Sequence, residues 1–452
     1  MPSSHRSIVG LVTSGVLLVA ALVLTVADDA RAAKAGTATL RASPQRADTI
    51  VKLAGGPRYP GGATLVHELT IGSVDGAEEY TFAALGDALL ARDGSIVIID
   101  RGGVPAGTPF VRQYDANGKY VRTIGRKGQG PGEYISPAGI VQLADGRILI
   151  RDGAQRRINV YSPSGESMDT WRLDPGLTIV GAGGLLFLDT AGIIYRRDFI
   201  RTQTERENSP PMGLVRMRAN GTVIDTVPPP DLPALAFPSL VARGTHGSRS
   251  AQVPYAPTTA WAWSPFGYAV TGRTDRYAID LRIPPRRPAG GGTAAAAPTL
   301  WKAGDPVISI RRDVRPVPIG DAERSARRTG MEAFLRAADP QWSWNGPDIP
   351  RFKPAFRAIR VAQDGRIWVT TAAPSEPYTP EPTSNPAGRV DSNVPFREPT
   401  VYDVFETDGT FLGQLRLPVR TTLAITKGDV AWTVVRDEDD VQTLRRFRIV
   451  WK

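Results

Sequence analysis

Aromatic and cationic residues gather in one short stretch of the chain, residues 341–356. Trp342 and Trp344 stand two positions apart, and Arg351 follows them. Two indoles near a guanidinium suit stacking on a sugar ring or another flat ligand, with the arginine pairing an anionic group. The alternative is that Trp342 and Phe352 pack into a small apolar core, because large aromatic side chains mostly bury their area. We predict Trp342, Trp344 and Arg351 as ligand-binding residues.

A second candidate is the glycine-rich stretch 125–132, in which Arg126 and Lys127 add positive charge. Backbone amides of such a loop can cradle a phosphate group. The stretch lacks the Gly-Lys-Ser/Thr ending of a nucleotide-binding loop and does not lead into a helix. A structural linker is therefore the favoured interpretation.

The chain offers little for metal binding or for catalysis. His67 and His246 have no histidine four positions away, and the absence of cysteine removes thiolate ligands. No Gly-x-Ser-x-Gly motif is present. Asp100 and Asp152 end apolar runs, and we expect them to accept hydrogen bonds from turn amides that hold adjacent repeat units in register. We predict no catalytic residue, no metal site and no cofactor.

The aromatic stretch directly follows the one good helix signal, residues 320–338. Asp321 is the predicted N-cap, and Met331, Phe334 and Leu335 form an apolar stripe. The chain around this signal is typical of short strands. We therefore predict residues 319–356 as one helical and aromatic insertion in an all-β fold.

Short alternating strands recur on both sides of glycine-containing turns. Alternation at period two around a turn such as Asp145-Gly146 is a hairpin signal. Six such turns, spaced by roughly 45 to 100 residues, indicate six supersecondary units with unequal insertions. The turns are Asp93-Gly94, Asp145-Gly146, Ala191-Gly192, Phe266-Gly267, Asp364-Gly365 and Gly428-Asp429.

The last unit lacks its outermost strand. An orphan strand at residues 64–71 precedes the first complete unit, and we predict that it pairs with residues 443–451. This pairing closes the units into a ring and leaves no exposed edge between the first unit and the last. The predicted fold is an all-β, six-bladed β-propeller over residues 63–452, its ring closed by the N-terminal strand added to the last blade.

Residues 121–166 contain GRKGQGPGEY, PAGI, DGRILIRD and RRINVYSPSGE in succession. This pattern resembles the NHL-like six-bladed β-propellers, including secreted bacterial members. In that family a Gly-Pro-Gly-Glu linker precedes the inner strand and an aspartate closes the next strand. The resemblance implies the propeller fold, and it implies little about chemistry because most of those members have no assigned activity.

Two classes of function fit such a propeller. In the first, a non-catalytic binding or scaffold protein captures a small ligand, a glycan or a partner protein through loops over one channel mouth. The alternative is a calcium-dependent hydrolase of the lactonase or esterase kind, which needs carboxylates converging from inner strands. The predicted inner strands contain no carboxylate, which favours binding; they are residues 82–85, 138–141, 178–181, 259–263, 356–359 and 421–424.

The N-terminus has the layout of a secretory signal. His5 and Arg6 precede the apolar residues 8–27, and Ala30-Arg31-Ala32 supplies small residues for cleavage. We predict a signal peptide at residues 1–32, a linker at 33–62 and a periplasmic or extracellular mature protein. An uncleaved segment of this length would instead anchor the chain in a membrane.

The overall charge is strongly basic, at +10. Such a charge can indicate a nucleic-acid partner, but no run of five basic residues occurs. We expect a solvated basic surface, no nucleic-acid partner and a monomer.

Overall fold

The computed structural model describes residues 50–53, 55–102, 107–173, 186–199, 212–227, 229–230, 232, 235, 239–244, 247–282, 308–380 and 393–452. The predicted signal peptide, His246 and the predicted inner strand at 178–181 lie outside these residues. Every described element belongs to one compact unit, residues 47–452.

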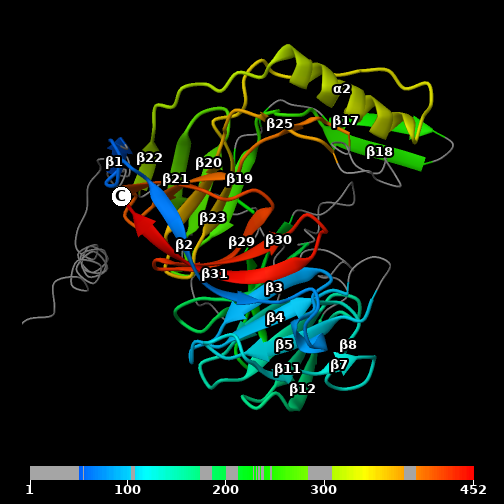
Figure 1. Cartoon of the computed structure of the whole chain (residues 1–452), viewed down its shortest axis with the longest axis vertical. Coiled ribbons are helices and arrows are strands. Elements are labelled where there is room, and N and C mark those ends of the chain that lie inside the picture. The colour runs from blue at the N-terminus through cyan, green and yellow to red at the C-terminus, as the bar shows by residue number, and fades with distance from the viewer. Residues whose placement is uncertain are drawn as a thin grey trace, which may run out of the picture. The chain divides into compact units, whose positions relative to one another are not determined.

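Short strands rich in β-branched residues pair into six four-stranded antiparallel units, numbered here as blades 1 to 6 in chain order (Figure 1). Blade 1 contains β3 (Leu85–Leu90), β4 (Ile96–Asp100), β5 (Phe110–Tyr114) and β6 (Tyr120–Thr123). Blade 2 contains β9 (Pro137–Gln142), β10 (Ile148–Asp152), β11 (Arg157–Tyr161) and β12 (Ser167–Arg172). Blade 3 contains β13 (Leu186–Leu188), β14 (Ile194–Phe199), β15 (Met212–Met217) and β16 (Val223–Val227).

The later blades carry the insertions. Blade 4 contains β19 (Thr259–Trp263), β20 (Ala269–Arg273), β21 (Ala278–Arg282) and β22 (Ile308–Arg311). Blade 5 contains β23 (Phe356–Val361), β24 (Ile367–Thr371), β27 (Val401–Phe405) and β28 (Phe411–Arg416). Blade 6 contains β29 (Thr421–Lys427), β30 (Val430–Arg436), β31 (Gln442–Trp451) and the N-terminal β2 (Ala63–Ile71). A parallel contact between β2 and β28 joins blades 5 and 6 into one eight-stranded sheet.

Smaller elements lie between the blades. They are β1 (Ile50–Leu53), η1 (Glu78–Tyr80), β7 (Arg126–Lys127), β8 (Glu133–Tyr134), β17 (Ser239–Gly244), β18 (Gly247–Gln252), α2 (Asp321–Arg336), β25 (Glu376–Pro377) and β26 (Phe396–Arg397).

The six predicted turns each join the first and second strands of a blade, as expected. At Gly146 the backbone angle φ is 88°. This left-handed conformation carries a steric cost for any residue with a Cβ, which is why glycine recurs at these turns. Local turn chemistry therefore sets the blade count.

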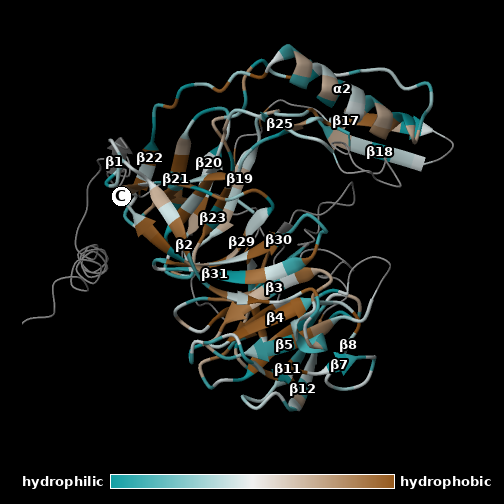
Figure 2. Ribbon diagram, in the orientation of Figure 1, coloured by the Kyte–Doolittle hydropathy of each residue, from teal (hydrophilic) through white to brown (hydrophobic). Residues whose placement is uncertain are grey.

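Apolar side chains of neighbouring blades pack face to face. Blade 1 contributes Ile99 to a cluster that contains Ile140 of blade 2, and blade 6 contributes Trp432 to a cluster that contains Ile98 of blade 1. The first strands also contact one another, β29 with β3, β3 with β9, β9 with β13 and β19 with β23. Figure 2 shows the hydrophobic character of the middle strand β4, whose residues are all buried.

The predicted strand exchange at the chain ends is confirmed. Strand β2 pairs antiparallel with β31, from Ala63 opposite Trp451 to Ile71 opposite Leu444. At the start of β31 the Gln442 side chain accepts a hydrogen bond from the Leu85 amide and so ties blade 6 to blade 1. Closure of all six blades into a complete ring stays a prediction.

Part of the segment predicted as a linker is hydrogen-bonded to the blades. Strand β1 pairs in parallel with β22 at the edge of blade 4. The Tyr59 amide donates to the Leu412 carbonyl at 2.9 Å, and the Tyr59 ring stacks on Trp451. Backbone pairing of so short a segment requires no hydrophobic period, so the sequence contains no strand signal here.

The predicted helix forms α2, with one correction at its start. The N-cap is Gly320, which makes no side-chain cap, and Asp321 is the first helical residue. Met331 and Leu335 are fully buried and pack against Leu240 of β17. Figure 1 shows α2 beside β17 and β18. Across the part of the chain that the structure describes, no helix is both long and apolar enough to cross a membrane.

Candidate ligand-binding cavity

The two aspartates that end apolar strands are occupied by backbone amides. Asp100 accepts hydrogen bonds from the amides of Ala83, Ala84 and Gly102, at 2.7 to 3.1 Å. Asp152 holds the amides of residues 135 and 136 in the same way. The amides of residues 83–84 and 135–136 lead into the first strand of the same blade, and Gly102 follows the second strand. These contacts stay within one blade, which corrects the expectation that the two aspartates link adjacent blades.

The glycine-rich stretch 125–132 is also satisfied internally. The Glu133 carboxylate accepts from the Gly130 amide at 2.8 Å and pairs with Arg126. The hydroxyl of Tyr161 donates to the Gly132 carbonyl at 3.0 Å. These contacts agree with the structural linker that the sequence favours.

The predicted aromatic site divides into buried and exposed parts. Trp342 is 5% exposed, lies in the apolar cluster beneath α2 and donates its indole N–H to the Val241 carbonyl. Trp344 is half-buried, with Arg328 over its ring. Arg351 is exposed, and Phe352 is 54% exposed rather than part of a core. The placement of Trp342 favours the packing alternative for that residue, and binding roles for Trp344 and Arg351 stay predictions.

A polar network anchors the insertion to blade 5. Glu323 of α2 accepts hydrogen bonds from Tyr255 at 2.5 Å and from Ser375 at 2.8 Å. The Lys353 ammonium donates to Ser375 and lies 3.3 Å from Glu398. Burial lowers the pKa of Lys353, opposed by the charges of Glu398 and Glu323. Because these groups use one another as partners, we interpret the network as a structural support.

A cavity of about 430 Å³ lies where the first strands of blades 1, 2, 3, 5 and 6 converge. One part of its wall is apolar, and another carries hydrogen-bonding groups. Lining residues include Leu85, Asp87, Ile140, Leu186, Arg360 and Gln363.

Asp87 owes its position to a β-bulge in β3. Leu85 pairs with Asp100 and Ala88 with Ile98, so Gly86 and Asp87 together oppose one residue of β4. Such a bulge redirects a side chain from its regular alternation. Here it accompanies an aspartate in the cavity wall.

The surroundings of Asp87 differ from those of Asp100 and Asp152, the two aspartates that end strands. No described residue gives its carboxylate a hydrogen bond or an ion pair. Burial raises its pKa, and the more distant charges of Arg101 and Arg360 oppose that rise. Arg360 donates to the Leu423 and Ala424 carbonyls, both at 2.6 Å. Asp87 is thus a half-buried carboxylate in the cavity wall to which no described residue donates a hydrogen bond.

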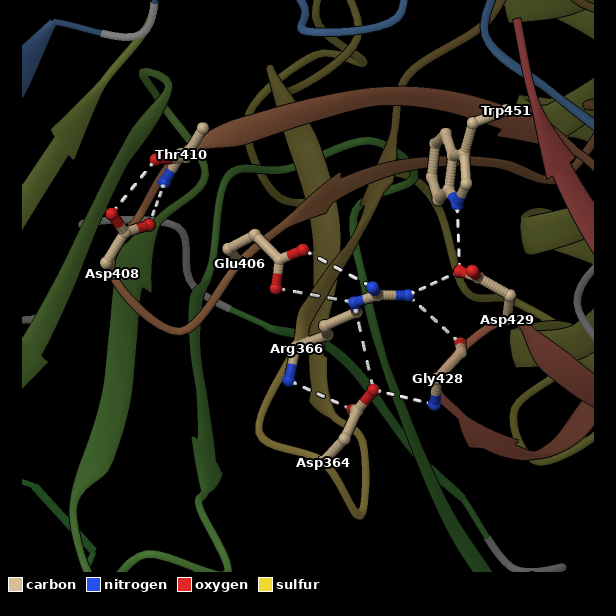
Figure 3. Close-up of polar contacts among 8 residues, drawn as sticks. All are labelled: Asp364, Arg366, Glu406, Asp408, Thr410, Gly428, Asp429 and Trp451. Atoms are coloured by element: carbon tan, nitrogen blue, oxygen red, sulfur yellow. Dashed lines mark hydrogen bonds and ion pairs between the residues drawn. The ribbon is translucent and has the colours of Figure 1, made fainter. Parts of the chain in front are cut away.

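Asp87 is absent from the predicted site because the predicted first inner strand ends at residue 85. The structure begins β3 at Leu85 and continues it to Leu90, so the carboxylate falls inside the strand. The bulge breaks the period-two pattern at this point, and the Gly86-Asp87 pair was the available signal. A further unpredicted cluster surrounds Arg366, which binds turns of blades 5 and 6 together (Figure 3).

Comparison with known proteins supports the fold. The model of a family described as six-bladed β-propellers, DUF5128, matches residues 89–195. No curated protein matches the chain. The fold prediction is confirmed, and the chain is a six-bladed β-propeller.

Solved structures with a similar arrangement include a member of the DUF4221 family from Bacteroides vulgatus, at 11% identity, 86% coverage of this chain, 99% of that chain and a TM-score of 0.46. The PQQ-bound aldose sugar dehydrogenase of Streptomyces coelicolor is 13% identical, with 87% of this chain and 100% of that chain covered and a TM-score of 0.39. Virginiamycin B lyase of Staphylococcus aureus is 9% identical, with 86% of this chain and 100% of that chain covered and a TM-score of 0.37. At such low identity these likenesses carry no argument about chemistry.

Proposed function

We propose that the chain is a non-catalytic binding propeller of the periplasm or cell exterior that holds a small hydroxylated ligand in the channel cavity. Asp87 is its polar anchor. The carrying observation is that this half-buried carboxylate lines the cavity without a hydrogen-bond partner among the described residues. A ligand that donates a hydrogen bond here would pair with a carboxylate to which no described side chain or backbone amide donates.

The ligand class follows from the two kinds of wall. Leu85, Ile140 and Leu186 suit the apolar face of a ring, while Asp87 and Gln363 suit its hydroxyl groups. Arg101 and Arg360 act on Asp87 through their positive charges. Those charges disfavour a cationic ligand, so neutral hydroxyl donors fit better than an ammonium group.

The calcium-dependent hydrolase is the competing function. Within the described ranges, no group of three histidine, aspartate or glutamate side chains is arranged to hold a metal ion. Asp87 by itself does not provide the several oxygen ligands that calcium takes. The experiment for the binding proposal therefore includes a calcium arm.

The test measures melting temperature and calorimetric affinity of the mature chain against a panel of monosaccharides, polyols and sugar lactones. We expect one or more of these compounds to bind. The Asp87→Ala variant should then bind roughly ten- to a hundredfold more weakly, because a hydrogen bond to a charged acceptor is lost. Asp321→Ala, at a carboxylate on the first turn of α2 that is fully exposed, is the matched control.

Three results would count against the proposal. One is a panel in which nothing binds, and another is equal affinity in wild type and Asp87→Ala. The third is a melting temperature that rises by several degrees with calcium alone, because a site specific to the folded state stabilises that state. That third result would favour the hydrolase.

A further inference from the structure

A second cavity, also of about 430 Å³, lies between blades 5 and 6 where strands β27 and β29 begin and β30 ends. Four arginines line it: Arg397, Arg416, Arg420 and Arg436. Arg416 and Arg420 flank the connection from β28 to β29, and Arg397 and Arg436 come from two other segments, so the fold and not a basic run produces the cluster. We call the cavity lined by these four residues the arginine cavity.

The carboxylates of this cavity do not match its arginines in number or in geometry. Glu376 pairs with Arg416. Asp440 lies 3.8 Å from Arg420 and 3.7 Å from Arg436, and its side chain is 57% exposed, so solvent weakens both pairs.

Two more residues complete the charge distribution. The buried Glu398 carboxylate lies within 3.3 Å of Lys353 and Arg357, so its charge is already compensated beneath the cavity. Arg397 stacks over the Tyr378 ring at 5.2 Å and pairs with no carboxylate among the described residues. The wall of the cavity therefore presents an excess of positive charge.

The backbone at the rim provides an independent observation. Arg420 has a φ of 56°, a left-handed conformation that is costly for a residue with a long side chain. The Arg436 amide donates to the Arg420 carbonyl, and the Arg420 guanidinium donates to the Asp437 carbonyl. These contacts hold the strained residue at the cavity. Such strain persists only where the surrounding structure enforces it, and it concentrates at functional positions.

We propose that the arginine cavity binds an oxyanion, either a phosphate group or a carboxylate. A guanidinium is always charged and offers paired N–H donors that match the two oxygens of either group. Thr400 and Thr422 at the cavity wall add hydroxyl groups, whereas the Thr421 hydroxyl donates to the Val419 carbonyl. The two cavities share Thr422 and Arg436 in their walls, but this site offers cationic donors and the Asp87 site offers a carboxylate acceptor. The oxyanion proposal does not depend on the proposed function.

The experiment uses the mature chain and two probes, inorganic phosphate and succinate, at constant ionic strength set with sodium chloride. We expect at least one probe to raise the melting temperature by a few degrees relative to chloride. Calorimetry should show at least a tenfold loss of affinity in the Arg397→Ala/Arg436→Ala double variant. The control is Arg126→Ala, because that side chain is 81% exposed and lies in β7, between blades 1 and 2. Urea unfolding of each variant verifies that it folds.

Each outcome decides the proposal. Binding of phosphate alone supports a phosphate ester as the natural ligand, binding of succinate alone supports an organic acid, and binding of both supports a general oxyanion site. The proposal is overturned if neither probe binds, or if the folded double variant keeps its affinity. Equal losses in Arg126→Ala and the double variant would also overturn it, because they would indicate diffuse attraction to a basic surface.

Discussion

Arginines lie at both ends of the strands of blades 5 and 6, and their contacts differ between the two ends. Arg366 precedes β24, and its guanidinium lies 2.8 Å from Asp429 and 3.3 Å from Glu406. It also donates to the Gly428 carbonyl at 3.0 Å. At the opposite ends of these strands, Arg397 stacks on a ring and Arg436 faces a single distant carboxylate. Three carboxylates surround the single Arg366, whereas four arginines line a cavity that has three carboxylates.

The difference shows that residue type alone does not identify a site. Arg366 joins the turn of blade 5 to the turn of blade 6 through its contacts with Gly428 and Asp429. Asp364 reinforces this link by accepting a hydrogen bond from the Gly428 amide (Figure 3). Its donors are used within the protein, which is the condition of a structural residue. Donors and acceptors left over by the fold, such as Asp87 and Arg397, are the ones available to a ligand.

The largest expected effect on the free energy of unfolding is at Arg366, whose donors are used within the protein. Arg366→Ala leaves Asp364, Glu406 and Asp429 near one another without their cation, and the Arg366 side chain is only 17% exposed. We expect the free energy of unfolding to fall by about 2–3 kcal/mol, because unpaired charges remain in a partly buried place. Urea unfolding measures this loss. Arg366→Lys is the matched variant and should recover part of it. A loss below about 0.5 kcal/mol in Arg366→Ala would contradict the structural role.

The pH dependence of stability tests the structural role of Arg366 through its partner Asp429, with a smaller expected effect. Burial alone would raise the pKa of Asp429, but hydrogen bonds from Arg366 and Trp451, together with the Arg366 charge, lower it below its usual 3.8. A carboxyl whose pKa is depressed in the folded state stabilises that state above its unfolded pKa, and the contribution disappears as the pH falls through the folded value.

We therefore expect the wild type to lose about 0.5 kcal/mol more than Asp429→Asn when the pH falls from 5 to below 3.8, after allowance for solvent screening. Urea midpoints measured across this range test the difference. Parallel pH curves for the two proteins would show that Arg366 does not hold Asp429 in its charged form.

Local signals explain which parts of the fold the sequence predicts. The glycine-containing turns, three of which are Asp-Gly, determine their own conformation, so six hairpins follow from positions such as Gly146 and Gly365. The pairing of β2 with β31 follows from the missing strand of the last unit. Strand β1 leaves no such signal, because parallel pairing to β22 uses only its backbone.

The candidate sites depend on contacts that a single sequence does not encode locally. A bulge in β3 brings Asp87 to the cavity wall, and neither the aromatic pattern at Trp342 nor the strand period indicates that position. The arginine cavity joins residues such as Arg397 and Arg436, which are far apart in the chain. Only the folded arrangement shows which of these groups remain without partners.

The smallest expected effect on stability is at Arg436 of the arginine cavity. The Arg436 side chain is 49% exposed, and its carboxylate partner Asp440 is 3.7 Å away. Arg436→Ala should therefore change the free energy of unfolding by less than about 0.5 kcal/mol when no oxyanion is present. The measurement is the urea midpoint in chloride buffer, beside Arg366→Ala as the contrasting variant. A loss as large as that of Arg366→Ala would mean that Arg436 is also a structural residue. Near-neutral stability means instead that the fold holds this arginine at the cavity without depending on it, which is what a group available to a ligand requires.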